Sequence, residues 1–564
     1  MAALVPRLMD QVVQQAQRLI AAGRRTEAIG ALVGGLAERR GGADAARWLA
    51  RLLGAYRLEP SPTVEAAIRV ASEFEEVDLQ PLVRSVVDCL LAKPQWKPLT
   101  AASDDDLRRR IATCLDAGGI APFDDPLLRK ILVRGVCHDV PLERILLALR
   151  ASLASRAPET LPSGWQDVAH GLACQAANNE YAWPAEPAEE HAVERLVERI
   201  AGAASPDDSD VLRAAMYRAP ATLPGFPLWR SRLTSPAVRA VLAATEGDSG
   251  TPSQSIRKLG RAQGSGSQRV QTQYEESPYP RWLALNPPLA GERRARLLAR
   301  CLPADRARFE GPIDVLIAGC GTGRQAITAA LGYGQPLRLT AVDLSAASLA
   351  YAARMARRYG TVPIEFVQLD LLDADRLDRD FDVIEAIGVL HHLADPMAGW
   401  RALARRLKPG GLMNVALYSE RGRQDVVAAR RAIAALAIEP TPEGIRRLRR
   451  LVLDAPADAQ DWRTTVRRFT DFFTLSGCRD LLFNVLEHRF TPLAVHSMLA
   501  ELGLELVSVD VPAATLARYR ARFSGDPAGL DLRLWDQFEV DNPTLFSGMI
   551  GLWCRNRTSS SERT

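Results

Sequence analysis

The chain has 564 residues, of which 47% are hydrophobic and 24% are charged, and its formal net charge at pH 7 is +4. This length exceeds what one hydrophobic core usually serves, so we expect two to four domains. So small a net charge favours no nucleic-acid partner, and no apolar run approaches the roughly 20 residues that span a bilayer. The first residues lack the apolar core of a secretory signal, which predicts a cytoplasmic protein.

The eight cysteines are dispersed along the chain without any C-x-x-C pair. This spacing argues against both a zinc knuckle and a disulfide framework. We therefore expect reduced thiols and no metal site.

Apolar residues at helical spacing predict an all-α region over residues 1–245. Residues 21–28 resemble the turn between the helices of a tetratricopeptide repeat (TPR), which suggests a TPR-like helical segment over residues 1–60. A repeat array needs about three stacked units, so we interpret residues 61–245 as an all-α domain for docking a protein or for homodimerisation. Gly, Ser, Gln and Thr dominate residues 246–272, a composition typical of a linker.

An apolar run over residues 313–318 ends in the turn Gly319-Cys320-Gly321-Thr322-Gly323, and a second apolar run ends at Asp343. This is the arrangement of a Rossmann-type pocket, in which the acid accepts hydrogen bonds from both ribose hydroxyls of a nucleotide. A dinucleotide fingerprint has a small residue where this chain has Arg324, because the pyrophosphate rests on the helix N-terminus. The compact glycine turn therefore favours S-adenosylmethionine (SAM), which carries no phosphates, over NAD.

Strand-like and helix-like segments alternate from residue 273 to residue 420, the predicted SAM-binding domain. Such alternation predicts a parallel α/β sheet whose ligand lies at the carboxyl ends of the strands. Two more strands within residues 491–555 complete a seven-stranded Rossmann-like sheet. The predicted strands are residues 313–318, 337–342, 364–367, 381–387, 411–418, 504–511 and 549–554.

Helical segments over residues 421–490 predict an insertion between strands five and six, which we expect to cap the ligand-binding edge of the sheet and exclude water. Arginines cluster between Arg421 and Arg468. A phosphate-binding face is one interpretation of this cluster. Since acids are interspersed and no aromatic residues alternate with the arginines, we favour a solvated helix surface. Residues 556–564 read as a disordered polar tail.

Five segments, in the order in which they follow one another along the chain, resemble those of the class I SAM-dependent methyltransferases. The resemblance covers about residues 273–555. It implies that the Gly319–Gly323 turn holds the methionine portion of SAM, Asp343 the ribose and Leu344 one face of the adenine. Asp370 and Leu371 would hold the adenine amino group and its other face, although Asp370 could instead cap the next turn. Ile387 and Gly388 would line the floor near the sulfonium. The five segments are Gly319–Gly323, Val342–Ser345, Leu369–Leu371, Phe381–His392 and Leu407–Gly411.

The segment Gln273–Trp282 resembles a Y-E-E-N-P-Y-P-R-W stretch in a narrower group of bacterial methyltransferases with helical or TPR-like N-terminal regions. That group includes rickettsial-type protein lysine methyltransferases, so the resemblance implies a protein lysine as the methyl acceptor. A small-molecule acceptor is the alternative, and a scaffold that binds SAM without catalysis is a third. Further similar segments are Leu142–Leu153, Asn179–Tyr181, Leu417–Glu420, Glu487–Thr491 and Phe538-Glu539.

Methyl transfer is an in-line displacement in which the protein mainly positions two reactants, and an amine acceptor must attack in its neutral form. Aromatic rings attract a methylammonium or a sulfonium through their faces, which makes four residues candidates, with core packing as the alternative. These candidates are Tyr274, Tyr279, Trp282 and Tyr418.

Glu385 and Glu420 lie towards the carboxyl ends of predicted strands four and five, where an acid could orient an amine or receive its proton. A structural salt bridge is the alternative for both. Glu487 and His488 are acceptor-side candidates or part of a hinge. His391 and His392 suggest a metal ligand pair or a base, but two adjacent histidines on a strand-to-helix turn point in different directions. We therefore favour a structural role for both, with the nearby Asp395 capping the next helix.

Overall fold

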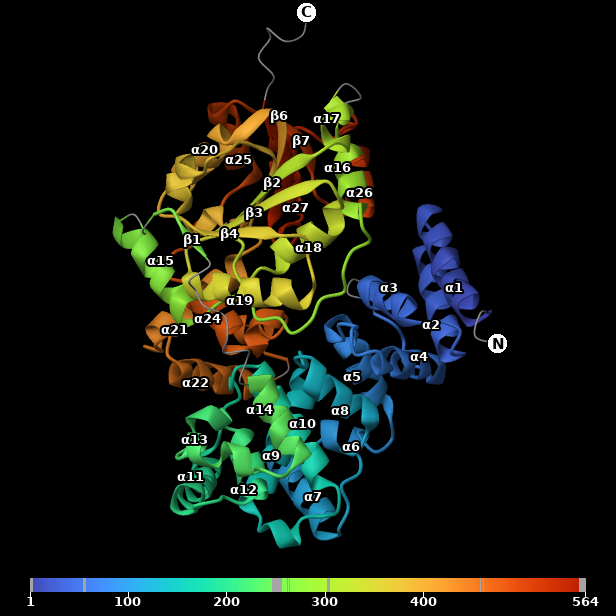
Figure 1. Cartoon of the computed structure of the whole chain (residues 1–564), viewed down its shortest axis with the longest axis vertical. Helices are drawn as coiled ribbons and strands as arrows, with labels where there is room; N and C mark the ends of the chain where they lie inside the picture. The colour runs from blue at the N-terminus through green and yellow to red at the C-terminus, as the bar shows by residue number, and fades with distance from the viewer. Residues whose placement is uncertain are drawn as a thin grey trace, which may run out of the picture. The chain divides into compact units, whose positions relative to one another are not determined.

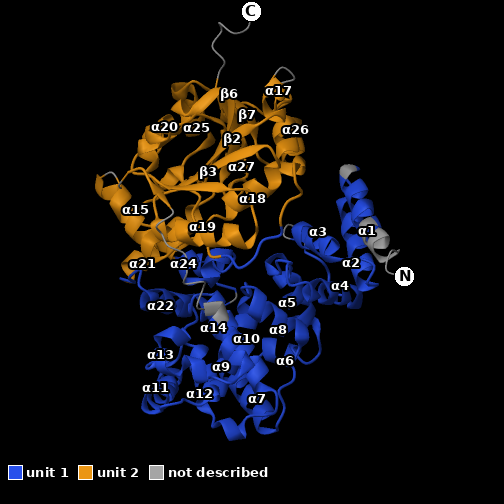
Figure 2. Ribbon diagram, in the orientation of Figure 1, with its two compact units in different colours: residues 1–249, 282–286, 437–478 blue, residues 250–281, 287–436, 479–564 orange. Residues whose placement is uncertain are grey.

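The computed structural model describes residues 4–53, 57–245, 256–260, 262, 264–301, 305–456, 458–459 and 461–556 (Figure 1). The chain divides into two compact units (Figure 2). Unit 1 comprises residues 1–249, 282–286 and 437–478, and unit 2 comprises residues 250–281, 287–436 and 479–564. No helix among the described residues is long and apolar enough to cross a membrane.

The regular elements among the described residues of unit 1 are helices, and their apolar faces form one core that includes Leu49, Leu146 and Leu172. Several helices begin where the sequence supplies a capping side chain followed by proline, as at Ser61-Pro62 and Asp125-Pro126. The α-helices before the first crossing to unit 2 are α1 (Leu4–Ala21), α2 (Arg25–Ala37), α3 (Ala43–Leu53), α4 (Pro62–Glu73), α5 (Val83–Ala92), α6 (Lys97–Thr100), α7 (Asp104–Asp116), α8 (Pro126–Arg134), α9 (Val140–Ser155), α10 (Trp165–Asn178), α11 (Pro187–Gly202), α12 (Asp208–Ala215), α13 (Phe226–Trp229) and α14 (Pro236–Thr245).

Residues 437–478, the middle of the predicted cap, belong to unit 1 rather than to the sheet-containing unit. They include α22 (Pro442–Leu453), α23 (Trp462–Val466) and the first residues of α24 (Leu475–Phe483). Arg449 of α22 is fully buried and forms an ion pair with the buried Glu143 of α9. The predicted cap over residues 421–490 is thus divided between the two units, and the buried ion pair with Glu143 of α9 holds its middle stretch within the helical unit.

The arginine cluster is also less solvated than we expected. Arg449 and Arg423 are buried, and each has a carboxylate partner, Glu143 and Glu487 respectively. Arg446 is partly buried and donates to the backbone carbonyl of Tyr181 at 2.8 Å. The charge pattern of the sequence does not reveal these partners, because they lie far away along the chain.

Unit 2 contains an eight-stranded sheet of order β1-β4-β3-β2-β5-β6-β8-β7, in which the first six strands are parallel and β8 is antiparallel to β6 and β7. The predicted α/β class is confirmed, with one strand more than expected. The strands are β1 (Arg257–Lys258), β2 (Ile313–Ala318), β3 (Leu337–Asp343), β4 (Ile364–Gln368), β5 (Phe381–Ile387), β6 (Leu407–Leu417), β7 (Leu504–Val509) and β8 (Ile550–Asn556).

The centre of the sheet is buried on both faces, as a parallel sheet requires. Every residue of β2 is buried, and its side chains alternate between two cores. Leu316 packs in one core with Ile384 of β5, whereas Val315 and Ile317 pack in the other. In the parallel register β2, β3 and β5 end at one edge, which is where Ala318, Asp343 and Ile387 lie.

Helices of unit 2 connect and cover the strands (Figure 1). Their bounds are α15 (Gly264–Glu276), α16 (Glu292–Leu298), α17 (Arg306–Glu310), α18 (Arg324–Tyr333), α19 (Ala346–Arg358), α20 (Pro396–Arg405), α21 (Gln424–Ala435), α25 (Pro492–Leu502), α26 (Ala513–Arg522) and α27 (Leu532–Asp541). Asp395 caps α20 as predicted, because its side chain accepts from the backbone N–H of Ala398 at 2.9 Å.

The linker prediction for residues 246–272 is wrong where the structure describes regular elements, since β1 and most of α15 lie there. The glycine- and serine-rich composition gives α15 little intrinsic helix propensity. Tertiary contacts override that weakness: Val270 is buried, and Gln271 donates to the carbonyl of Leu344 at 3.1 Å. Residues 246–255 lie outside the described residues, as do residues 557–564 of the predicted tail, whereas Asn556 ends β8.

We predict that Glu143→Ala destabilises unit 1 by about 3–5 kcal/mol, because it leaves the buried Arg449 guanidinium without its carboxylate. Urea unfolding followed by far-UV circular dichroism measures the loss. Glu443→Ala is the matched control: Glu443 pairs with Arg446 on the same helix, but its side chain is 79% exposed, so we expect a loss below about 1 kcal/mol. Equal losses in both variants would contradict the assigned role of the Glu143–Arg449 pair.

Candidate active site

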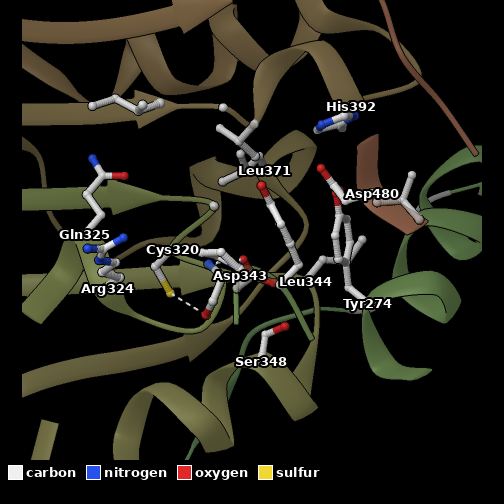
Figure 3. Close-up of a pocket in the computed structure, with 18 of the residues that line it drawn as sticks. Tyr274, Cys320, Arg324, Gln325, Asp343, Leu344, Ser348, Leu371, His392 and Asp480 are labelled. Atoms are coloured by element: carbon white, nitrogen blue, oxygen red, sulfur yellow. Dashed lines mark hydrogen bonds between the residues drawn. The ribbon is translucent and has the colours of Figure 1, made fainter. Parts of the chain in front are cut away.

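A cavity of about 480 Å³ lies in unit 2 at the carboxyl ends of β2, β3 and β5. Figure 3 shows Arg324 and Gln325 on one side of it, Tyr274, Asp480 and His392 on the other, and Asp343 and Leu344 between them. The lining residues are Val270, Tyr274, Tyr279, Pro280, Arg293, Gly319, Cys320, Gly321, Arg324, Gln325, Thr328, Asp343, Leu344, Ser348, Leu369, Asp370, Leu371, Ile387, Gly388, Val389, His392, Leu393, Tyr418, Asp480 and Met549.

The turn after β2 requires glycine for two reasons, backbone conformation and close packing. Gly319 and Gly323 have φ values of 68° and 85°, which side-chain-bearing residues rarely adopt. A Cβ atom at Gly319 would lie 2.2 Å from Val389, and one at Gly323 would lie 2.4 Å from Ala352. The backbone of the turn thus packs directly against Val389 and Ala352, and it forms part of the cavity wall.

Three of the five turn residues line the cavity, namely Gly319, Cys320 and Gly321. Thr322 is buried, and its hydroxyl donates to the carbonyl of Pro280 at 2.6 Å. Gly323 begins α18. Thr322 and Gly323 therefore shape the turn without lining the cavity, although we predicted that they bind the cofactor.

Asp343 ends β3 and lines the cavity together with Leu344. One carboxylate oxygen accepts from the N–H of Gly321 at 2.7 Å and the other from the N–H of Ser345 at 2.9 Å. Burial raises the pKa of Asp343, and these backbone donors oppose the shift without cancelling it. Each oxygen keeps a further lone pair that can accept from a ribose hydroxyl.

The other cofactor-binding candidates also lie on the cavity wall. Asp370 and Leu371 follow β4, and Ile387 and Gly388 lie at the end of β5. Asp370 also accepts from the N–H of Leu372 at 3.1 Å and caps the 3-10 turn there. Both alternatives for Asp370, cap and cavity wall, hold at once.

The opposite wall contains a carboxylate that the sequence analysis missed. Asp480 is buried and accepts from the hydroxyl of Tyr274 at 2.6 Å and from the side-chain amide of Asn484 at 3.0 Å. Burial, and then the Asp480 carboxylate, raise the pKa of Tyr274 well above its usual value, so its phenol remains a donor. No motif marks Asp480, which lay inside the predicted cap.

The four aromatic candidates have different places. Tyr274, Tyr279 and Tyr418 line the cavity, whereas Trp282 is a buried residue of unit 1 and does not. The ring of Tyr418 is stacked on His391 at 3.8 Å between centroids, and the guanidinium of Arg423 lies 3.7 Å from its centroid. Two groups this close cover opposite faces of the ring. Tyr418 therefore cannot offer a face to a methylammonium, and the predicted cation–π role is wrong for it.

None of the predicted catalytic acids lines the cavity. Glu385 is buried and accepts from Arg293 at 2.8 Å, from Gln325 at 2.7 Å and from the Tyr333 hydroxyl at 2.7 Å. Because Arg293 and Gln325 do line the cavity, Glu385 positions them rather than contacting a substrate. A place near the end of a strand does not fix the direction of a side chain, since successive residues point to opposite faces.

The remaining candidates take structural roles. Glu420 pairs with Arg489 at 3.1 Å, and Glu487 is buried against Arg423 at 2.7 Å and Arg430 at 3.3 Å. His488 donates its backbone N–H to the carbonyl of His391 at 2.8 Å, and its Nε2 atom is buried. The salt-bridge alternative thus describes Glu420, and Glu487 likewise forms ion pairs instead of lining the cavity.

We predict that Glu487→Gln destabilises the protein at pH 7 by about 3–5 kcal/mol, since it leaves Arg423 buried without a carboxylate. Burial would raise the pKa of Glu487, but Arg423 and Arg430 outweigh it and hold the pKa below its usual value. The contribution of the Glu487 carboxylate to the free energy of unfolding is therefore complete above its pKa in the unfolded chain, about 4.3. This contribution is lost as pH falls through the lower pKa that Glu487 has in the folded protein.

Urea unfolding of wild type and variant at pH 7 and at pH about 3 tests this prediction, because the difference should shrink at acid pH. Glu420→Gln serves as the control, since its side chain is 43% exposed and should contribute less than about 1 kcal/mol. A difference independent of pH would contradict the assigned ion pair.

Comparison with known proteins identifies part of unit 2. Residues 315–411 match the family described as a methyltransferase domain. An uncharacterized protein of Synechococcus sp. is 43% identical over 133 residues, which are 23% of this chain and 31% of that protein. A ubiquinone biosynthesis O-methyltransferase of Pseudomonas syringae pv. tomato is 33% identical over 108 residues, 19% of this chain and 44% of that enzyme. The chain thus spans less than half the length of either relative.

A solved structure of PKMT2 from Rickettsia typhi in complex with AdoHcy aligns with 44% of this chain and 49% of that chain, at 14% identity and a TM-score of 0.35. A score this low supports no inference about the acceptor. The matched domain confirms the predicted class I SAM-dependent methyltransferase fold and SAM as its cofactor, in agreement with the glycine turn and the Asp343 carboxylate at the cavity.

Proposed function

We propose that unit 2 transfers the methyl group of SAM to an amine, and that the amine is a lysine side chain of a protein. The observation that carries this proposal is the cavity itself, which has the residues predicted to bind the nucleoside on one side and a buried carboxylate on the other. SAM supplies a methyl group on a positively charged sulfur atom, so the protein needs to orient the two reactants and exclude water.

The donor side follows from the residues at the strand ends. Asp343 would accept from the ribose hydroxyls, with Leu344 and Leu371 against the faces of the adenine and Asp370 at its amino group. The backbone of Gly319–Gly321 would hold the methionine portion. Arg324 and Arg293, the latter paired with Glu385, line the same cavity, where a guanidinium can bind the carboxylate of the methionine portion.

The acceptor side favours an ammonium over a hydroxyl group. Asp480 Oδ2 and His392 Nε2 form no hydrogen bond with any described residue, and both residues line the cavity. An ammonium group has three donors to satisfy such acceptors, whereas a hydroxyl group has one. The Asp480 carboxylate also compensates a positive charge that enters a buried site.

Methylation of a small-molecule hydroxyl is the second candidate, and the identity with a ubiquinone biosynthesis O-methyltransferase favours it. A protein acceptor gives unit 1 a role as the docking domain or as a dimerisation domain. A small-molecule acceptor would leave unit 1 without a role in substrate binding.

We predict that Asp343→Ala weakens SAM binding at least about 100-fold, because it removes the acceptor of two hydrogen bonds worth roughly 1.5 kcal/mol each. Isothermal titration calorimetry gives the Kd, and circular dichroism checks the fold. Asp375→Ala is the control, since Asp375 is 53% exposed and pairs with Arg405 outside the cavity. Unchanged affinity in Asp343→Ala would contradict the assigned ribose contact.

We expect the wild-type protein, incubated with methyl-labelled SAM and whole-cell protein extract, to label protein bands as methylated lysine. Asp480→Asn keeps the hydrogen-bonding shape but removes the charge, and we expect it to raise the KM for the protein acceptors at least about tenfold. Label confined to small molecules would favour the second candidate. Tight SAM binding without any transfer would show a scaffold that does not catalyse.

A further inference from the structure

We infer that His392 is the base that removes the proton from the acceptor amine. This inference rests on the proposed function and assigns a proton acceptor within that same cavity. Of the roles that the adjacent histidines suggested, it gives His392 that of a base in place of the structural one.

The hydrogen bond of the His392 ring fixes its tautomer. His392 Nδ1 lies 2.8 Å from the backbone carbonyl oxygen of Leu486. A carbonyl oxygen only accepts, so Nδ1 carries the hydrogen, and in the neutral ring Nε2 is the unprotonated acceptor. Nε2 forms no hydrogen bond with any described residue, and His392 lines the cavity. The free lone pair of the ring is therefore the one available at the acceptor side.

The two neighbouring histidines are not placed for this role. His391 is stacked on Tyr418, its Nδ1 accepts from the Tyr418 N–H at 3.3 Å, and its buried Nε2 has no hydrogen-bond partner among the described residues. His488 Nε2 is also buried and forms no hydrogen bond within the part of the chain that the structure describes. Neither residue lines the cavity. Among these three residues, His392 alone combines an anchored Nδ1 with a place on the cavity wall.

The surrounding residues hold the His392 ring in place before a substrate binds. It lies in the 3-10 turn Leu390–His392, where its backbone N–H donates to the carbonyl of Val389 at 2.9 Å. The ring packs edge-on against His391, with 4.4 Å between centroids. A base held in this way loses little entropy when it meets its substrate.

The groups at the cavity account for each proton and electron pair in the methyl transfer. Asp480 Oδ2 accepts one N–H of the acceptor ammonium, and a second N–H gives its proton to His392 Nε2, which leaves a lone pair on the amine nitrogen. That lone pair forms the new N–C bond as the C–S bond breaks, and the electrons of the C–S bond remain on sulfur. The products are the methylated ammonium and S-adenosylhomocysteine, and His392 then releases its proton to water.

The test uses the full chain, methyl-labelled SAM and whole-cell protein extract. His392→Asn and His392→Gly should each lower the initial rate of transfer at least about 100-fold, the usual contribution of a general base. Their Kd for S-adenosylhomocysteine should stay within about threefold of wild type, which equals less than about 0.7 kcal/mol. Added imidazole should raise the initial rate of His392→Gly at least about tenfold.

His496→Gly is the matched control, because His496 is exposed on α25 and outside the cavity. It should keep the wild-type rate and gain nothing from imidazole. A ¹⁵N spectrum of histidine-labelled protein, assigned with His392→Asn, should show His392 with its hydrogen on Nδ1.

Each other outcome counts against the inference. Full transfer in both His392 variants, a loss that imidazole does not restore, or a hydrogen on Nε2 would overturn the base while leaving the proposed methyl transfer intact. A wild-type protein that binds S-adenosylhomocysteine but transfers no methyl group would overturn the proposed function, and the base with it.

Discussion

The contact between the Asp343 carboxylate and the glycine turn organises the donor side of the site. Asp343 is tied to the N–H of Gly321 and to that of Ser345, so the end of β3 and the turn after β2 keep one fixed relation. The turn can come this close because its glycines have no side chains that would collide with Val389 and Ala352. The parallel register of β2 and β3 brings both elements to the same edge of the sheet. Burying a carboxylate costs desolvation free energy, which its backbone donors partly offset. The remaining lone pairs of Asp343 can accept hydrogen bonds from the two hydroxyl groups of a ribose.

The acceptor side depends on charges that are buried and compensated in pairs. Glu487 holds Arg423, and Arg423 together with His391 covers both faces of Tyr418. Tyr274 and Asn484 both donate to Oδ1 of Asp480, so that Oδ2 can accept from a ligand. The same kind of pair, Glu143 with Arg449, holds part of the insertion within unit 1. Removing one partner of a buried ion pair lowers the free energy of unfolding by far more than an exposed ion pair contributes to it.

Local signals were enough to predict the elements that form the donor side. The glycine turn, the acid at the end of β3 and the bounds of β2 and β5 follow from short stretches of sequence, because strand ends and tight turns are determined by neighbouring residues. The acceptor side could not be predicted in this way. Asp480 meets Tyr274 across more than 200 positions of sequence, and the tautomer of His392 depends on the carbonyl of Leu486. The directions of Glu385 and Glu487 likewise depend on partners that no motif reveals.

A crystal structure of the protein with S-adenosylhomocysteine tests the central claim most directly. We expect both ribose hydroxyls within hydrogen-bond distance of the Asp343 carboxylate, the adenine between Leu344 and Leu371, and the sulfur atom on the side of the cavity that contains Asp480 and His392. A nucleoside bound elsewhere, or a sulfur atom directed towards Arg324 and Gln325, would contradict this account.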